Sequence, residues 1–295
     1  EHMGFIFWNH GSGVSSGLCI DTVHDYDSLS LGEVEYAFAK ANKKMTDKFE
    51  LIGFDTCLSG SIEYANILAP YTKYMVASAD SEPGDGWNYT PIIDYIVQNP
   101  DATGLDVGKK IADAYDEYYS QDEDVNGYTT MAVYDLSKID AACIETNNFA
   151  KFLFEQFEQD NKAYNNFANV IEKSLLYEEL NVDLGTLIKA LKENNFIKYD
   201  TAKFEQSINE LICYNNIGEE YLTKIDTILY LCKLEDPSID INNITLSMID
   251  TIYLGDDYVL FVTNRDNVLK FVLPYDDRAH KEIEMILNQI EKDYE

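Results

Sequence analysis

Short apolar runs alternate with amphipathic helical patterns in the first half of the chain. Each apolar run ends in a polar or glycine-containing turn, as expected where a buried strand ends. Predicted strands cover residues 4–8, 51–54, 74–78 and 128–134, and predicted helices cover residues 31–41, 61–68, 90–98 and 104–120. Ser30 and Glu33 form a capping box before the first helix, and residues 14–29 are predicted as a polar loop. This order indicates βαβ units and an α/β fold with a mainly parallel sheet.

The pattern changes near residue 146. Residues 147–232 are mostly helical in pattern and rich in Phe, Tyr, Leu, Asn and Glu. Residues 243–273 predict a β-meander with a turn at 264–267, and a last helix is predicted at 277–291. We therefore expect one α/β domain over residues 1–146 and a C-terminal α+β subdomain over residues 147–295 that packs on it.

The charge of the chain limits its partners. The chain has 295 residues with 22 Lys and Arg against 53 Asp and Glu, a net charge of −31. Such a charge repels phosphate backbones, so neither nucleic acid nor an anionic membrane is expected as a partner. It favours cationic substrates or ions. No run of 18 apolar residues occurs, so no membrane-spanning helix is expected.

The cysteines and histidines do not form a metal-ligand pattern. The chain has no Cys-x-x-Cys pair and no His-x-x-x-His pair, which disfavours a metal-dependent hydrolase. The odd number of cysteines leaves at least one free thiol. Four of the five are interpreted as structural thiols: Cys19, Cys143, Cys213 and Cys232.

The fifth cysteine lies where a strand ends, as one histidine does. In an open α/β sheet, ligands bind beyond the carboxyl ends of the strands, and neighbouring parallel strands would bring His10, Cys57 and the loop at 80–87 together. A cysteine peptidase needs a thiolate and an imidazole that serves as acid and base. Either residue alone is more often structural, but the pair at equivalent strand ends favours catalysis. The N–H groups of Gly11 and Cys57 could form an oxyanion hole, and a following helix would lower the thiol pKa.

These residues carry a family resemblance. The motifs Phe7-Trp8-Asn9-His10-Gly11, Phe54-Asp55-Thr56-Cys57-Leu58, Glu82–Tyr89 and Tyr134–Lys138 occur in that order, and Cys57 lies 47 positions after His10. The sequence resembles clostripain-like cysteine peptidases of the caspase–gingipain–legumain clan. The resemblance implies a caspase-like catalytic domain in residues 1–146 and a secreted or cell-surface bacterial endopeptidase. The alternative is a catalytically idle binding or scaffolding module on the same fold.

The resemblance also implies a substrate class. In the family, the positions of Asp55 and Asp85 line the S1 pocket, which selects Lys or Arg before the cleaved bond. Asp80 and Glu82 are alternatives for the second acid. No arginine occurs before Arg265, so the catalytic half offers no guanidinium to hold an acidic P1 side chain.

Two further expectations concern calcium and the start of the chain. The chemistry requires no cofactor, although some family members use calcium. The acidic clusters at 21–27 and 122–124 could bind it, but a solvated acidic face is favoured. Family members carry strands before the histidine-bearing strand. We therefore expect a segment before Glu1 that supplies at least one more strand, and the protein's own cleaved N-terminal segment is a possible partner.

Overall fold

The computed structural model describes most of the first 217 residues. The described ranges are 2–121, 129–160, 162–171, 174–177, 181–193 and 197–217, together with strands at 249–254, 257–263 and 268–274. The predicted last helix at 277–291, the acidic cluster at 122–124 and Cys232 lie outside the described residues.

A five-stranded mixed sheet forms the centre of the fold. Its strands, in spatial order, are β1 (Gly4–Trp8), β4 (Phe49–Asp55), β5 (Thr72–Ala77), β6 (Thr130–Asp135) and β9 (Ile212–Ile217). The first three run parallel, whereas β6 and β9 are antiparallel to their neighbours. The sheet therefore has a parallel core but is less parallel overall than the sequence pattern predicts.

The direction of β6 follows from two helices that precede it. The chain leaves β5 and forms α4 (Tyr89–Gln98) and then α5 (Gly104–Tyr119). Helix α5 starts beside Glu50, at the beginning of β4, and ends at the loop beyond the carboxyl ends of the parallel strands, where the Tyr119 hydroxyl donates to the Gly86 carbonyl. Because the chain crosses the sheet twice, it enters β6 from the carboxyl edge and runs antiparallel to β5.

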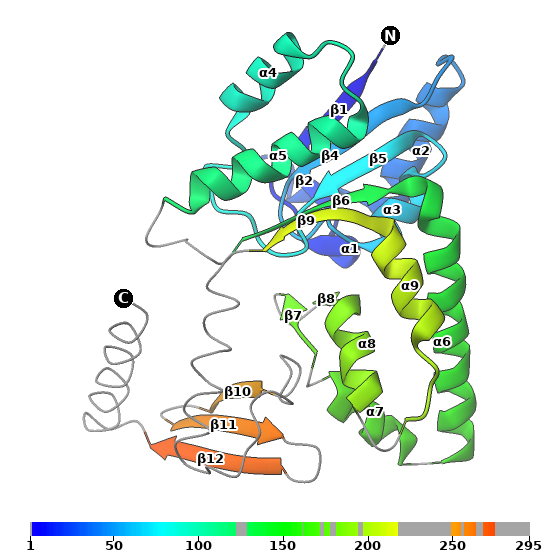
Figure 1. The fold of residues 1–295 in the computed structure, drawn as a ribbon, viewed down its shortest axis with the longest axis vertical. Coiled ribbons are helices and arrows are strands. Elements are labelled where there is room, and N and C mark those ends of the chain that lie inside the picture. The colour runs from blue at the N-terminus through cyan, green and yellow to red at the C-terminus, as the bar shows by residue number, and fades with distance from the viewer. Residues whose placement is uncertain are drawn as a thin grey trace.

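The two-residue repeat of the strands separates two hydrophobic cores. Leu51, Val76 and Val133 pack toward α4 and α5 on one face of the sheet. Ile52 and Met75 point to the opposite face, toward α2 (Leu31–Asn42), α3 (Ile62–Leu68), α6 (Ile139–Gln159) and α9 (Ala202–Leu211). Figure 1 shows the helices on both sides of the sheet. The same alternation directs Asp55, the last residue of β4, toward α5.

The second half of the chain contributes to both the sheet and its core. Helix α6 runs without interruption through the predicted boundary between residues 146 and 147, and β9 pairs with β6. Phe149 and Phe204 belong to the same buried cluster as Phe54 in the sheet. Residues 147–217 are therefore continuous with the α/β layer rather than separate from it. The elements between α6 and α9 are α7 (Ala163–Ile171), β7 (Leu176–Tyr177), β8 (Asn181–Val182) and α8 (Leu184–Glu193).

Three smaller sheets complete the described structure, and one of them is the antiparallel pair of β7 and β8. Strands β10 (Ile249–Leu254), β11 (Asp257–Thr263) and β12 (Val268–Pro274) form the antiparallel meander that the alternating pattern predicts. The segment predicted as a polar loop contains a short helix, α1 (Gly13–Ser16), and a hairpin of β2 (Leu18–Asp21) and β3 (Asp27–Leu29). Periodicity does not reveal this hairpin, because its apolar anchor is short: Leu18 is fully buried and Cys19 is partly buried against the same core.

None of the helices that the structure describes has the length and apolar character needed to span a membrane.

The packing of α5 gives a stability prediction. A side chain at Gly104 would overlap the Glu50 backbone carbonyl, whereas one at Gly32 in α2 would meet nothing within 4 Å. We expect Gly104→Ala to lower the free energy of unfolding by about 1–3 kcal/mol through overpacking. Gly32→Ala should be neutral or stabilise by up to about 1 kcal/mol, since alanine favours a helix. Denaturant unfolding of both variants beside the wild type is the measurement. Equal effects of the two substitutions would contradict the packing described for α5.

Candidate active site

His10 and Cys57 lie at matching positions beyond two paired strands. In the parallel register of β1 with β4, Trp8 pairs with Asp55, and each candidate residue follows its paired residue by two positions. The register thus places the imidazole and the thiol at the same edge of the sheet, as the sequence predicts. The His10 side chain is exposed and Cys57 is half-buried. No hydrogen bond joins the His10 ring to the Cys57 sulfur among the described residues.

Gly11 brings the two loops into direct backbone contact. A side chain at this position would overlap the Cys57 carbonyl oxygen and lie 3.1 Å from the Cys57 nitrogen. The loop of Gly11 is held on its other side by Leu18, through hydrogen bonds from the Cys19 N–H to the His10 carbonyl and from the Ser12 N–H to the Gly17 carbonyl. Only a residue without a side chain allows this approach, so glycine is required here for space.

Two backbone donors beside the thiol are unused. In the described part of the chain, neither the Gly11 N–H nor the Cys57 N–H donates a hydrogen bond to a protein acceptor. Backbone N–H groups are normally paired, with protein groups or with water. The two donors belong to loops in contact, so they can serve a single acceptor at the site, as the oxyanion-hole prediction for Gly11 and Cys57 requires.

The sulfur of Cys57 contacts the backbone of Glu82, in the loop after β5. The Glu82 N–H donates to Cys57 Sγ at 3.2 Å, and Sγ lies 3.6 Å from the Glu82 carbonyl oxygen. Helix α3 begins only at Ile62 after its N-cap Ser61, so Cys57 does not lie at a helix N-terminus. The predicted help from a helix dipole is therefore wrong, because that effect falls off within the first turn. The Glu82 N–H supplies a charge-stabilising contact to the sulfur instead.

The turn after Cys57 is fixed by neighbouring backbone. Leu58 has a positive φ of 56°, which is uncommon for a non-glycine residue. Its N–H donates to the Asp80 carbonyl, the Gly60 N–H donates to the Ser78 carbonyl, and the hydroxyls of Thr56 and Ser59 lie 2.6 Å apart. The loops after β4 and β5 thus hold each other, and the conformation of the Cys57 turn depends on both.

Asp55 is buried beneath the loop that carries Glu82. It is 4% exposed, and one of its carboxylate oxygens accepts hydrogen bonds from the Trp87 N–H at 3.3 Å and the Tyr89 hydroxyl at 2.8 Å. Burial raises the pKa of Asp55, although these two donors oppose the shift. Burial raises the pKa of the Tyr89 hydroxyl well above its ordinary value, and its hydrogen bond to Asp55 raises that pKa further.

Glu82 places a second carboxyl beside Asp55. Both of its carboxyl oxygens are buried, and neither has a hydrogen-bond partner of good geometry among the described residues. Burial raises the pKa of Glu82 well above its usual range, and repulsion from Asp55 raises it further. The Tyr115 hydroxyl and the Trp87 ring N–H are buried and unpartnered as well. The sequence offered Glu82 only as an alternative acid, because its burial depends on the tertiary fold.

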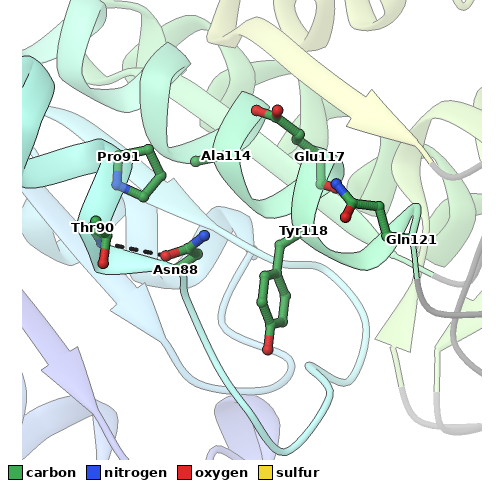
Figure 2. A pocket seen from close by; sticks show the side chains of 7 residues that line it. All are labelled: Asn88, Thr90, Pro91, Ala114, Glu117, Tyr118 and Gln121. Carbon is green, nitrogen blue, oxygen red and sulfur yellow. Dashed lines mark hydrogen bonds between the residues drawn. The ribbon is translucent and has the colours of Figure 1, made fainter.

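Asp85, the other predicted S1 acid, does not contact Asp55 in this structure. It is exposed, and its carboxylate accepts a hydrogen bond from the Tyr118 hydroxyl of α5 at 2.9 Å. Tyr118 also lines an open pocket of about 470 Å³ between the start of α4 and the end of α5 (Figure 2). Asp80, the remaining alternative acid, accepts a hydrogen bond from the Ser81 N–H through its carboxylate. The structure therefore brings Asp55 and Glu82 together and leaves Asp85 on the outer side of the loop.

The sequence does not predict a role in the site for several aromatic residues. Tyr89 and Trp87 hold Asp55, while Tyr119 fixes the same loop through the Gly86 carbonyl. Trp87 and Tyr89 belong to the motif Glu82–Tyr89, which predicts a loop but no role for either side chain. Tyr115 and Tyr119 are signalled by their helical spacing on α5, which predicts a buried face and not a role in a site.

The other cysteines and the acidic loop lie in environments of their own. Burial raises the pKa of the Cys19 and Cys143 thiols, which keeps them protonated and poorly nucleophilic. In the acidic loop, Asp21 accepts hydrogen bonds from the Val23 N–H and lies 2.8 Å from the His24 ring. No group of three or more His, Cys, Asp or Glu side chains that could hold a metal occurs among the described residues. Calcium binding stays a prediction.

Comparison with known proteins assigns this site to a family. The family model of the clostripain family matches residues 1–280, so the chain belongs to the clostripain family. It has the fold of a clostripain-family cysteine protease. No curated protein matches the chain.

Solved structures agree with this fold. The chain is similar to a secreted C11 cysteine protease from Bacteroides thetaiotaomicron in complex with an irreversible peptide inhibitor, with 17% identity, a TM-score of 0.53 and coverage of 74% of this chain and 58% of that chain. A structure described as a secreted C11 cysteine protease from the same organism, "iotapain", has 21% identity, a TM-score of 0.51 and coverage of 74% and 60%. The chain thus matches about three fifths of the length of these two proteins, and at such identities the likeness is one of fold.

Two glycines in the loop after β5 test the support of Asp55. Gly86 has a φ of 65°, and a side chain there would come within 2.8 Å of an Asp55 carboxylate oxygen, whereas one at Gly84 would meet nothing within 4 Å. We expect Gly86→Ala to lower the free energy of unfolding by about 1 kcal/mol or more, since alanine is strained at positive φ. Gly84→Ala should change it little. Thermal unfolding midpoints of the two variants provide the comparison, and a larger loss for Gly84→Ala would contradict the loop conformation.

Proposed function

We propose that this chain is a cysteine endopeptidase that cleaves after Lys or Arg, with Cys57 as nucleophile and His10 as acid and base. The observation that carries the proposal is the β1–β4 register, which places both residues beside two unused backbone N–H groups. The inhibitor-bound relative from Bacteroides thetaiotaomicron is described as a cysteine protease with a peptide inhibitor, which is consistent with a peptide substrate here.

The proposed reaction begins at the sulfur of Cys57. Its thiolate attacks the carbonyl carbon of the scissile bond, and the oxygen that becomes negative accepts hydrogen bonds from the N–H groups of Gly11 and Cys57. The imidazolium of His10 then donates a proton to the leaving nitrogen, so the amine departs and an acyl-enzyme remains. His10, now neutral, accepts a proton from water. The resulting hydroxide attacks the acyl carbon, and the thiolate of Cys57 leaves.

The geometry around the sulfur supports a thiolate in two ways. The Glu82 N–H already points at the sulfur, and a hydrogen bond to an anion is about twice as strong as one between neutral groups. His10 is exposed and its ring is free of other protein hydrogen bonds among the described residues, so it can approach the sulfur when substrate binds. Catalytic hydrogen bonds are often long before the substrate complex forms.

The charge of the site supports a cationic P1 side chain. Asp55 and Glu82 lie on the α5 side of the sheet, directly beneath the Cys57 turn, and no lysine or arginine pairs with either in the described part of the chain. A buried cation is tolerable when its charge is paired, and this site offers acids for that purpose. Lys- or Arg-containing peptides or proteins are the proposed substrates. A secreted location, as described for the relatives, is proposed with them.

The first test removes the catalytic groups. We expect Cys57→Ala to abolish hydrolysis of a fluorogenic peptide with Arg at P1, and His10→Ala to lower kcat/KM by about 100-fold or more, the typical value of general acid–base catalysis. Cys143→Ala, in α6, should retain wild-type turnover because its thiol is structural. Unfolding midpoints near that of the wild type show that the variants fold. Wild-type turnover by Cys57→Ala would refute the nucleophile, and an inert wild type would favour the idle binding module.

The second test measures P1 preference. We expect kcat/KM to be highest for Arg and Lys in matched peptides that end in Arg, Lys, Asn, Asp or Leu. Asp55→Asn should lower the values for Arg and Lys by about 10-fold or more, since a hydrogen bond to a charged group contributes about 1.5–3 kcal/mol. Asp85→Ala should have the smaller effect, because Asp85 faces Tyr118 rather than Asp55. A wild-type preference for Asp or Asn would refute the pocket.

A further inference from the structure

The two carboxyl groups of Asp55 and Glu82 form a buried acid pair. Asp55 reaches the site from the end of β4, and Glu82 from the loop after β5, so the pair joins two strands that are neighbours in the sheet. Two acids that repel each other are costly to bury. No ion pair to either acid occurs in the part of the chain that the structure describes.

The surroundings of the acid pair contain donors but no cation. The groups that face it are the Cys57 thiol from the turn after β4, the Trp87 ring N–H from the loop after β5, the Tyr89 hydroxyl from α4, and the hydroxyls of Tyr115 and Tyr119 from α5. Asp85 adds a more distant negative charge at Tyr119. All of these groups are neutral or acidic, so no cation among the described residues compensates a doubly ionised pair.

The two acids differ in how well their ionised forms are supported. Asp55 accepts hydrogen bonds from the Trp87 N–H and the Tyr89 hydroxyl, which stabilise its carboxylate. Both oxygens of Glu82 are buried without a hydrogen bond of good geometry among the described residues. The Trp87 ring N–H opposes the rise in the Glu82 pKa but does not cancel it. This difference favours ionisation of Asp55 and protonation of Glu82 in the free protein. This is the usual outcome for two carboxyl groups that share one site.

Glu82 also connects the acid pair to the nucleophile. Its backbone N–H and carbonyl lie within 3.2 and 3.6 Å of the Cys57 sulfur, so the same residue touches the nucleophile through its backbone and Asp55 through its side chain. The P1 residue is the one whose carbonyl the sulfur would attack, and Glu82 is a residue whose backbone contacts that sulfur. Its carboxyl is therefore a candidate to meet a P1 side chain.

We propose that Glu82 is a specificity-determining residue whose carboxyl exchanges its proton for the cationic end of a Lys or Arg P1 side chain. In this exchange, the Glu82 O–H bond breaks, its proton passes to water or buffer, and the carboxylate that remains pairs with the ammonium or guanidinium group. The inference rests on the proposed P1 preference and deepens it. It makes recognition of a cation depend on the release of a proton.

The exchange has a definite pH dependence. At low pH Glu82 is protonated, so a cation meets the single charge of Asp55; at high pH it meets two charges. Affinity for a cationic P1 group therefore rises as pH rises through the titration of Glu82. Because a cation in contact lowers the pKa of an acid by about one unit or more, linkage makes the gain in affinity about 10-fold or more.

A matched pair of variants isolates this effect. Glu82→Gln keeps the shape of the side chain but cannot ionise, and Glu35→Gln makes the same change at an exposed position of α2. The quantity compared is the KM of Glu82→Gln for the Arg peptide divided by the KM of the wild type for the same peptide. We expect this ratio to be near one at low pH and to reach about 10 or more at high pH. Titration of the catalytic pair cancels in this ratio. Glu35→Gln should give a ratio near one at every pH, and a pH-independent ratio for Glu82→Gln would overturn the proposal.

Proton release gives a readout that does not depend on turnover. In the inactive Cys57→Ala background, calorimetry of an Arg-ending peptide amide in buffers of different ionisation enthalpy measures the protons released on binding. We expect release with the Arg peptide, none with its uncharged citrulline counterpart, and none once Glu82→Gln is added. Arg binding without proton release at any pH would overturn the exchange while leaving the proposed P1 preference intact.

Infrared spectroscopy of the free protein distinguishes a failure of the proton exchange from a failure of the proposed P1 preference. The protonated carboxyl of Glu82 should give a C=O stretch that disappears in Glu82→Gln and persists in Glu35→Gln. If this band is present but the wild type does not prefer Lys or Arg, the proposed function fails and the exchange fails with it, although the acid pair itself is real. If the band is absent throughout the acidic and neutral range, the exchange alone is overturned.

Discussion

The parallel pairing of β1 with β4 is the constraint on which the site depends. It places His10 and Cys57 two positions beyond a pair of residues in register, and it sets Gly11 against the Cys57 backbone. A shift of one residue would turn every side chain of the strand to the other face of the sheet. The register is fixed by apolar side chains on both faces, among them Phe54 toward α3 and Leu51 toward α5. Packing of the strands far from His10 and Cys57 thus sets how these two residues lie relative to each other.

The predictable part of this protein is the part encoded by local pattern. The strands that lead to His10 and Cys57, the capping box at Ser30 and the meander after residue 243 follow from periodicity and turn residues, and the structure confirms them. The direction of β6 could not be predicted in this way, because it depends on how two helices cross the sheet. The hairpin after α1 could not be predicted for a related reason: its apolar anchor is short, namely Leu18 with the partly buried Cys19.

In the candidate site, too, the positions of residues could be predicted from local pattern, whereas their contacts could not. The positions of Cys57, His10 and Asp55 follow from strand ends, whereas the environment of the Cys57 sulfur does not. Cys57 is contacted by the Glu82 N–H rather than by a helix terminus, and Asp55 is held by Tyr89 from a different helix. These contacts join residues 25 and 34 positions apart in sequence. No spacing rule reveals such contacts before the β5 loop folds back over β4.

Helix α5 links the packing of the sheet to the conformation of the loop around Glu82. It starts against the Glu50 carbonyl at the amino edge of the sheet and ends with Tyr119 holding the Gly86 carbonyl at the opposite edge. The loop around Glu82 has its support from this helix and from the Cys57 turn. A chain in which α5 has not yet docked lacks this support. The contacts that hold the loop against Asp55 and Cys57 therefore form only as the fold is completed.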